Sequence, residues 1–181
     1  FLTITRSPRS APMESALAGA LRVRCLTGAK AALGDVPASI VSCAGATVMA
    51  ALDTACPSMD SLKEKRVLVV GLGMLGLLAV EAALRAGAAV TATDPNSHRR
   101  RYAAQLGACI SGFSDFDPAL DIVENFDVAL EFSGSPQGVI TCLKPLDING
   151  VAVLAGSVAD SPAIDLPRMD CPRLAHCYRR V

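Results

Sequence analysis

Apolar residues occur along this chain in short runs that alternate between two kinds of segment. Runs rich in β-branched and small apolar residues predict five strands, at residues 66–70, 89–93, 109–113, 126–132 and 151–155. Stretches of helix-forming residues between them predict helices at 75–86, 96–106 and 137–146, with a helical turn or two near 119–125. Strands that alternate with helices need crossover connections, so the pattern predicts a parallel sheet in an α/β protein.

The segments outside this alternation have weaker patterns. Residues 38–56 are apolar nearly all round and predict a helix that is buried on most sides. Residues 21–26 alternate like a short half-buried strand. Residues 1–16 predict a disordered leader, and residues 161–181, which contain three prolines and no periodicity, predict an irregular tail.

The first predicted strand runs directly into a glycine-rich turn, Gly71-Leu-Gly-Met-Leu-Gly76. Gly71 permits the tight turn, Gly73 lets the backbone approach a pyrophosphate, and Gly76 lets the next helix lie close to the sheet. The N–H groups at the start of that helix, around Met74 and Leu75, can bind the phosphates without a basic side chain. The spacing therefore predicts a nucleotide-binding Rossmann fold, a doubly wound parallel sheet with helices on both faces.

The second predicted strand ends in an acid, Asp94, which lies 23 residues after Gly71. A carboxylate at this place can accept hydrogen bonds from both ribose hydroxyls of an adenosine, and it would repel a 2′-phosphate. This favours NAD over NADP, although the basic run 99–101 could reach a phosphate if Asp94 turned away. The alternative is purely structural: the glycines only form a turn, and Asp94 only caps the next helix.

Composition and charge exclude several classes of protein. A chain of 181 residues holds one good-sized domain with flanking segments. Its 17 basic residues balance 17 acidic ones, so nothing indicates a nucleic-acid or anionic-membrane partner. The longest uncharged stretches, 36–52 and 67–80, are too short or too broken to span a bilayer, which predicts a soluble protein.

The seven cysteines argue for a reducing compartment. Their number is odd and no two form a Cys-x-x-Cys pair, which speaks against a disulfide framework and a four-cysteine zinc site. We therefore expect a cytoplasmic protein. His176 lies near Cys171 and Cys177 in the tail, but their spacing matches no zinc motif.

From about residue 17 to 158, the sequence resembles the coenzyme-binding half of the medium-chain, zinc-type alcohol dehydrogenases. Besides the glycine turn, three segments carry the resemblance: Ser42-Cys-Ala-Gly-Ala-Thr47, Glu131-Phe-Ser-Gly-Ser-Pro136 and Asn149-Gly-Val-Ala-Val-Leu-Ala-Gly-Ser157. The sequence after Cys43 is most similar to that of a bacterial branch associated with phosphonate catabolism. The resemblance implies that 17–37 is the edge of a catalytic domain and 38–160 an NAD-binding domain.

The resemblance also implies roles for single residues. Cys43 would be a catalytic-zinc ligand, Thr47 would face the nicotinamide, and Arg99 would lie on the adenine side. Main-chain walls near the nicotinamide and its ribose would come from Ser133, Gly134, Ala155, Gly156 and Ser157. From the residues alone, Cys43 is more often a packed thiol in such a helix.

In this family the other zinc ligands come from a preceding catalytic domain, so zinc is expected only together with that domain. We therefore expect the NAD-binding half of an oxidoreductase that passes hydride between a small alcohol or aldehyde and NAD, inactive in isolation. A homo-oligomer is compatible with the resemblance. The alternative is a non-catalytic NAD-binding module or truncated product. A methyltransferase-like protein is a third hypothesis, which the Gly-x-Gly-x-x-Gly spacing disfavours.

Overall fold

The computed structural model describes residues 41–56, 59–111 and 125–156. The chain divides into two compact units, Phe1–Ala46 and Thr47–Val181. The described part of the first unit is a π-helical turn, η1 (Val41–Gly45), together with Ala46. The expected leader at 1–16, the edge segment at 17–37 and the tail at 161–181 lie outside the described residues.

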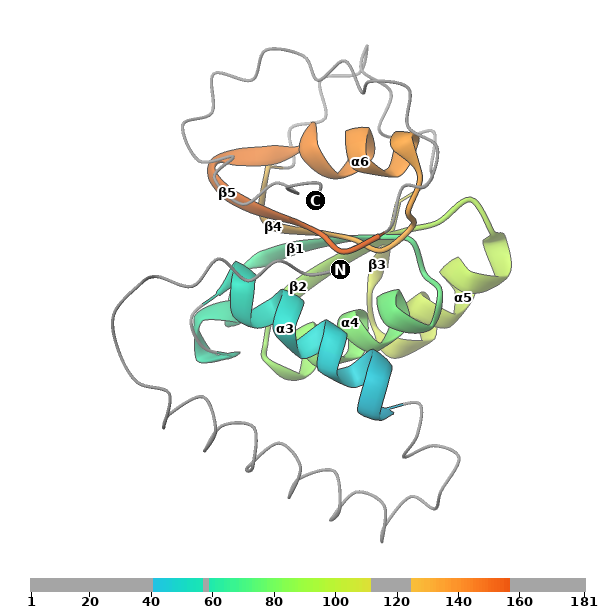
Figure 1. The fold of residues 1–181 in the computed structure, drawn as a ribbon, viewed down its shortest axis with the longest axis horizontal. Helices are drawn as coiled ribbons and strands as arrows, with labels where there is room; N and C mark the ends of the chain where they lie inside the picture. The colour runs from blue at the N-terminus through green and yellow to red at the C-terminus, as the bar shows by residue number, and fades with distance from the viewer. Residues whose placement is uncertain (1–40, 57–58, 112–124, 157–181) are drawn as a thin grey trace, which may run out of the picture. The chain divides into compact units, whose positions relative to one another are not determined.

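The second unit is built on a sheet of five parallel strands (Figure 1). Their bounds are β1 (Arg66–Val70), β2 (Ala89–Thr93), β3 (Cys109–Ile110), β4 (Phe126–Glu131) and β5 (Leu146–Leu154). The strand order is β3-β2-β1-β4-β5, so the order in which the chain adds strands to the sheet reverses between β1 and β4. The last residue of β1, Val70, pairs with Thr93 of β2 on one side and Glu131 of β4 on the other. The predicted doubly wound parallel sheet is confirmed.

Helices cover both faces of this sheet, with α3 and α4 on one face and α6 on the other (Figure 1). The bounds are α3 (Ala46–Ala55), η2 (Met59–Leu62), α4 (Met74–Arg85), α5 (Ser97–Leu106) and α6 (Pro136–Leu143). Residues at both ends of α5 fix where this helix begins and ends. The Asn96 side chain caps its start, and Gly107 ends it in the left-handed region at φ 108°. No helix in the described ranges is long and apolar enough to cross a bilayer.

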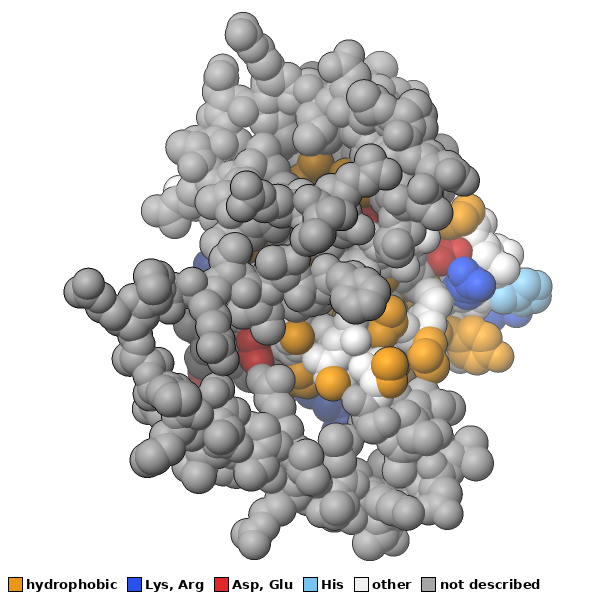
Figure 2. All heavy atoms as spheres, in the orientation of Figure 1, with side chains coloured by type: hydrophobic (Ala, Val, Ile, Leu, Met, Phe, Trp, Pro, Cys, Tyr) orange, Lys and Arg blue, Asp and Glu red, His pale blue; other side chains and the backbone are white. Residues whose placement is uncertain are grey.

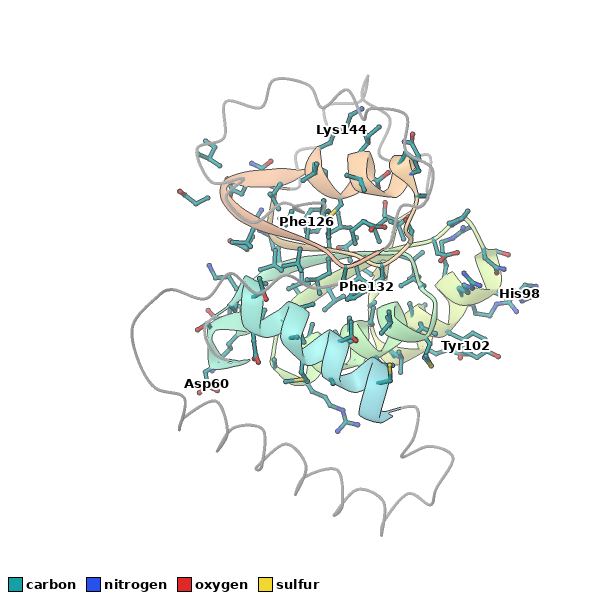
Figure 3. All side chains as sticks on the ribbon, viewed as in Figure 1. Asp60, His98, Tyr102, Phe126, Phe132 and Lys144 are labelled. Carbon is teal, nitrogen blue, oxygen red and sulfur yellow. The ribbon has the colours of Figure 1, made fainter. Side chains whose placement is uncertain are left out.

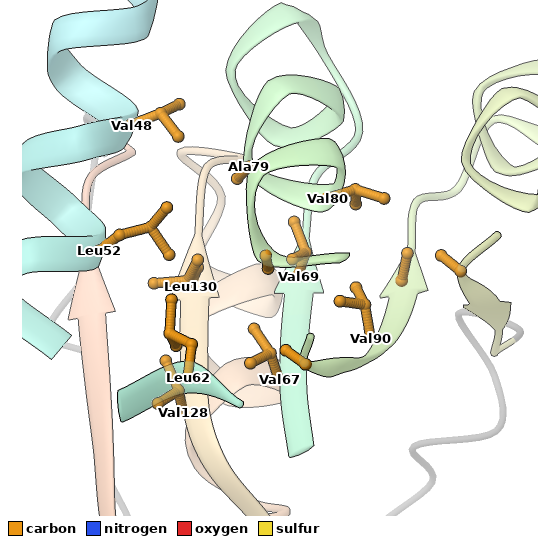
Figure 4. Close-up of a cluster of buried hydrophobic side chains, with 14 of the residues drawn as sticks. Val48, Leu52, Leu62, Val67, Val69, Ala79, Val80, Val90, Val128 and Leu130 are labelled. Carbon is orange, nitrogen blue, oxygen red and sulfur yellow. The ribbon is translucent and has the colours of Figure 1, made fainter. Parts of the chain in front are cut away.

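The core lies on both faces of the sheet because side chains alternate along each strand. Val67 and Val69 of β1 point to the face covered by α3 and α4 and share one buried cluster with Val48 and Leu52 of α3 and Val80 of α4 (Figure 4). Leu68 and Val70 point to the other face, over which α6 lies. Each such side chain stabilises the fold by about 1.5–3 kcal/mol when fully buried. This burial fixes the positions of the strand ends.

The structure corrects the predicted end of α6 and start of β5. The sequence predicts a helix through Leu146, a turn at Asn149–Gly150 and then a strand, whereas α6 ends at Leu143 and β5 already begins at Leu146. Leu146 pairs with Phe126, and the register shifts before Val128. A Cβ on Gly150 would lie 2.7 Å from the Phe126 carbonyl oxygen. The predicted turn is therefore an irregularity within the strand.

An ionic cluster joins the starts of three strands. The Asp127 carboxylate accepts a hydrogen bond from the Arg66 main-chain nitrogen at 2.9 Å, and its other oxygen lies 3.5 Å from Lys65 Nζ. The Arg66 guanidinium also reaches Asp147 Oδ2 at 3.2 Å. These contacts hold β1, β4 and β5 together at the edge opposite their carboxyl ends.

This cluster predicts a stability that depends on pH. Burial raises the pKa of Asp127, but the Arg66 N–H bond and the charges of Lys65 and Arg66 outweigh it, so the net pKa lies below its usual value. A carboxylate with a lowered folded pKa stabilises the fold above its unfolded pKa of about 3.9, and this stabilisation is lost as the pH falls through the folded value.

Asp127→Asn should keep the acceptor for Arg66 but lose the charge. We expect it to lower the free energy of unfolding by up to about 1 kcal/mol at pH 7. Urea denaturation followed by circular dichroism would measure this, and the difference from the unmodified protein should shrink as the pH falls below about 4. A difference that stays constant with pH would contradict the assignment.

Candidate functional site

The carboxyl ends of β1, β2, β4 and β5 bring together most of the residues that the sequence singles out. Open α/β sheets bind ligands at this edge, in the crevice where the strand order reverses. Here the reversal lies between β1 and β4. Three turns follow these strands, namely β1–α4, β2–α5 and β4–α6, and the end of β5 lies beside the last of them.

Gly71 makes the first turn and touches the third. Its φ is +89°, and its nitrogen donates to the Thr93 carbonyl at 2.9 Å. A Cβ on Gly71 would lie 2.6 Å from the Ser133 nitrogen and 2.9 Å from the Phe132 carbonyl carbon. Because main-chain atoms cannot move aside as a side chain does, this position requires glycine for both conformation and space.

Gly73 and Gly76 have opposite surroundings. A Cβ on Gly76 would clash with the Gly71 carbonyl oxygen, whereas a Cβ on Gly73 would meet nothing within 4 Å. Gly73 is the N-cap of α4 and has no side chain to cap the helix. Next to it Met74 is exposed and Leu75 half-buried. The start of α4 therefore presents main-chain N–H groups beside open space, an arrangement that suits a phosphate.

Asp94 is held between the first and second turns. Its side chain is only 3% exposed. Oδ2 accepts a hydrogen bond from the Leu72 nitrogen at 2.7 Å, and Oδ1 accepts one from the Asn96 nitrogen at 2.8 Å. The N-cap of α5 is Asn96, so capping that helix is not the role of Asp94. A carboxylate offers about four acceptor positions, which leaves capacity for ribose hydroxyls.

The basic run at the start of α5 is tied to Asp94. Arg99 Nη1 lies 3.6 Å from Asp94 Oδ2, and Arg100 Nη1 donates to the Asp94 carbonyl at 2.6 Å. The basic side chains and the histidine that gather at the right of Figure 2 belong to this helix. His98 and Tyr102 point outward from it (Figure 3). Arg99 and Arg100 thus contact Asp94 in this structure instead of pointing away from it.

The β4–α6 turn is organised by an acid that the sequence analysis did not single out. Glu131 is fully buried at the end of β4. Its Oε1 accepts hydrogen bonds from the Ser133 nitrogen at 2.6 Å, the Gly134 nitrogen at 3.0 Å and the Ser133 hydroxyl. Its main-chain oxygen accepts from Ala155 and Gly156 at 2.9 and 3.0 Å. The signal in the sequence is an acid directly after the apolar run 128–130.

Cys43, the residue predicted as a zinc ligand, is exposed on η1. Thr47, predicted to face the nicotinamide, is half-buried in α3. Among the described residues, no group of three histidine, cysteine or acidic side chains is arranged to hold a metal ion. The predicted cofactor residue Ser157 lies outside the described residues, as do Cys171, His176 and Cys177 of the tail.

The contacts at Gly76 and Gly73 predict losses of stability of different size for the same substitution. An alanine inside a helix normally stabilises it by about 0.5–1 kcal/mol relative to glycine. Gly76→Ala should instead lower the free energy of unfolding by about 2–4 kcal/mol, because the added methyl meets the Gly71 main chain.

Gly73→Ala is the matched control, since its methyl points into open space, and we expect it to cost less than about 1 kcal/mol. Urea unfolding of both variants checks this. Equal losses at the two positions would show that the turn is not packed as described.

Comparison with known proteins identifies a family. The sequence profile of a family described as zinc-binding dehydrogenase matches residues 75–178, which is 104 of the 181 residues. L-threonine 3-dehydrogenase of Legionella pneumophila (strain Corby) is 33% identical over 106 residues, which cover 55% of this chain and 31% of that protein.

Solved structures give a similar result. Acetophenone reductase from Geotrichum candidum, solved in complex with NAD, superposes with a TM-score of 0.55 and 27% identity, covering 64% of this chain and 32% of that one. An alcohol dehydrogenase from Thermotoga maritima superposes with a TM-score of 0.60 and 25% identity, covering 71% and 37%. The chain thus spans about a third of the length of these relatives.

Proposed function

Since the chain belongs to the zinc-binding dehydrogenase family, we propose that it binds NAD and forms the coenzyme-binding half of an oxidoreductase. One observation carries this proposal: the start of α4 offers main-chain N–H groups and an open Gly73 at the point where the strand order reverses. A pyrophosphate needs main-chain donors with room beside them, and this arrangement supplies both.

The other predicted site residues, at the carboxyl ends of β2, β4 and β5, would contact different halves of the coenzyme. Asp94 would accept the adenosine ribose hydroxyls, with Arg99 on the adenine side. On the other side of β1, the main chains of Ser133, Gly134, Ala155 and Gly156 would line the nicotinamide half, which Thr47 would face. Support comes from the topology, because each half of a doubly wound sheet takes one nucleotide of a dinucleotide.

The reaction that we propose for the complete enzyme is hydride transfer between a small alcohol or its carbonyl product and NAD. Bound NAD supplies the hydride acceptor, and the protein supplies orientation and electrostatics. The relatives' names include a threonine dehydrogenase and an acetophenone reductase, so a small-molecule substrate is the common element. Neutral net charge supports neither nucleic acid nor membrane as a partner.

Zinc does not enter the proposal for the described residues. A catalytic zinc takes three protein ligands, and Cys43 is the one candidate that the family resemblance gives here. No second or third ligand joins it within the described ranges. We therefore propose NAD binding for this chain and place turnover on residues outside those ranges. An NAD-binding module without turnover is the second candidate. A cytoplasmic location and a homo-oligomer stay predictions.

Titration of the chain with NADH, followed by nicotinamide fluorescence, tests the proposal. We expect saturable binding, and we expect Gly73→Asp to weaken it by at least about a hundredfold, because a carboxylate would fill the open space beside the pyrophosphate and repel it. Asn149→Asp adds the same charge at an exposed position in the first half of β5 and should leave binding unchanged.

Equal effects of the two aspartates, or no saturable binding at all, would refute the proposal. Saturable binding without turnover of any alcohol would favour the NAD-binding module.

A second titration compares NADH with NADPH. The Asp94 charge should repel the 2′-phosphate, so we expect tighter binding of NADH. In Asp94→Asn the ratio of the two affinities should fall by about tenfold, because the amide removes the repulsion while Arg99 remains to attract the phosphate. An unchanged ratio would mean that Asp94 does not face the ribose.

A further inference from the structure

Glu131 is a buried acid at the end of β4, with several hydrogen-bond donors on one carboxylate oxygen and none on the other among the described residues. It is 0% exposed, and the alternation along β4 places it on the same face as Ala129, the α6 face. Three donors converge on its Oε1, all from Ser133 and Gly134. Hydrogen bonds to a charged acceptor are roughly twice as strong as neutral ones, so this single oxygen fixes the conformation of the turn.

The second carboxylate oxygen faces β5. Among the described residues Oε2 has no hydrogen-bond partner. A Cβ on Gly156 would clash with both this oxygen and the Gly134 nitrogen. The carboxylate is thus wedged between the turn and the end of β5, with glycine on both sides. A buried polar atom without a partner destabilises the fold, so apolar packing alone does not account for an acid at this place.

The turn that Glu131 holds also contacts the glycine turn. The Ser133 main chain that Glu131 holds is the same main chain against which Gly71 packs, with 2.6 Å from a Gly71 Cβ to the Ser133 nitrogen. Glu131 therefore sets the distance between the end of β5 and the β4–α6 turn, on the nicotinamide side of Gly71. The Asp94 side of the rim has its own hydrogen bonds, to Leu72 and Asn96, and shares none of these contacts.

We propose that Glu131 is a positioning residue for the nicotinamide half of NAD. It holds Ser133–Gly134 and Ala155–Gly156 in the geometry that receives that half, while the adenosine half binds independently of it. This inference rests on the proposed NAD binding. It differs from a general stabilising role, because a general role would affect both halves of the coenzyme equally.

Two ligands separate the halves, namely NADH, which occupies both, and ADP, which carries only the adenosine side. The experiment measures both dissociation constants on the 181-residue chain by calorimetry, and the fluorescence of bound NADH as a signature of the nicotinamide environment. For Glu131→Ala we expect NADH binding to weaken by at least about tenfold and its fluorescence to change, with ADP binding within about twofold.

Three further variants sharpen the test. Glu131→Gln keeps an acceptor for Ser133 and Gly134 and should stay within about threefold for NADH. Gly156→Ala presses on the same carboxylate from β5 and should reproduce the selective loss, which keeps the test decisive if Glu131→Ala does not fold. Asp127→Asn removes a carboxylate at the other end of the same strand and should change the affinity for neither ligand.

The outcomes are distinguishable. A selective loss for NADH in Glu131→Ala or Gly156→Ala, with recovery in Glu131→Gln, supports the inference. Equal losses for NADH and ADP, or no loss for either, overturn it while leaving NAD binding intact. If the unmodified chain binds neither ligand, the proposed function itself fails, and the inference fails with it.

Discussion

The arrangement of the loops at the carboxyl ends of the strands depends on the close approach of main chains at Gly71. This residue bends in the left-handed region, donates to Thr93, and packs against the backbone of both Gly76 and Ser133. A side chain on Gly76 would push the helix from the sheet, and one on Gly71 would push β1 from the β4–α6 turn. The distance between the three loops is therefore set by the absence of side chains, and only then can polar groups bridge them.

Two buried carboxylates hold the loops in place on either side of β1. Asp94 ends one neighbouring strand and accepts main-chain N–H groups from the first and second turns. Glu131 ends the other and accepts N–H groups from its own turn. In both cases an acid replaces the water that would otherwise satisfy loop donors, so the loops stay ordered without regular secondary structure. The opposite edge uses exposed ion pairs around Asp127 for the simpler task of joining strand ends.

Most of the fold could be predicted because the local sequence patterns favour the same strands and helices that the folded sheet contains. The buried strands β1, β2 and β4 are apolar runs, and α5 begins and ends at the residues that cap it. The start of β5 was missed because Asn149-Gly150 is a typical turn sequence, although Leu146-Asp-Ile-Asn149 alternates apolar and polar residues. Its pairing with Phe126 places Leu146 in the strand. Glu131 was missed as a site residue for a different reason. Its role exists only once Gly156 and the turn lie around it, and no local pattern encodes that neighbourhood.

The orientation of Asp94 has a consequence for how binding energy would be used. Its two oxygens are held by Leu72 and Asn96, and Arg99 lies against it. A rotamer-rich side chain that must be ordered on binding costs about 0.5–1.5 kcal/mol, and this preorganised carboxylate avoids that entropic cost. Recognition at this site would therefore resemble a rigid lock more than an induced fit, because the carboxylate would meet the ribose already oriented.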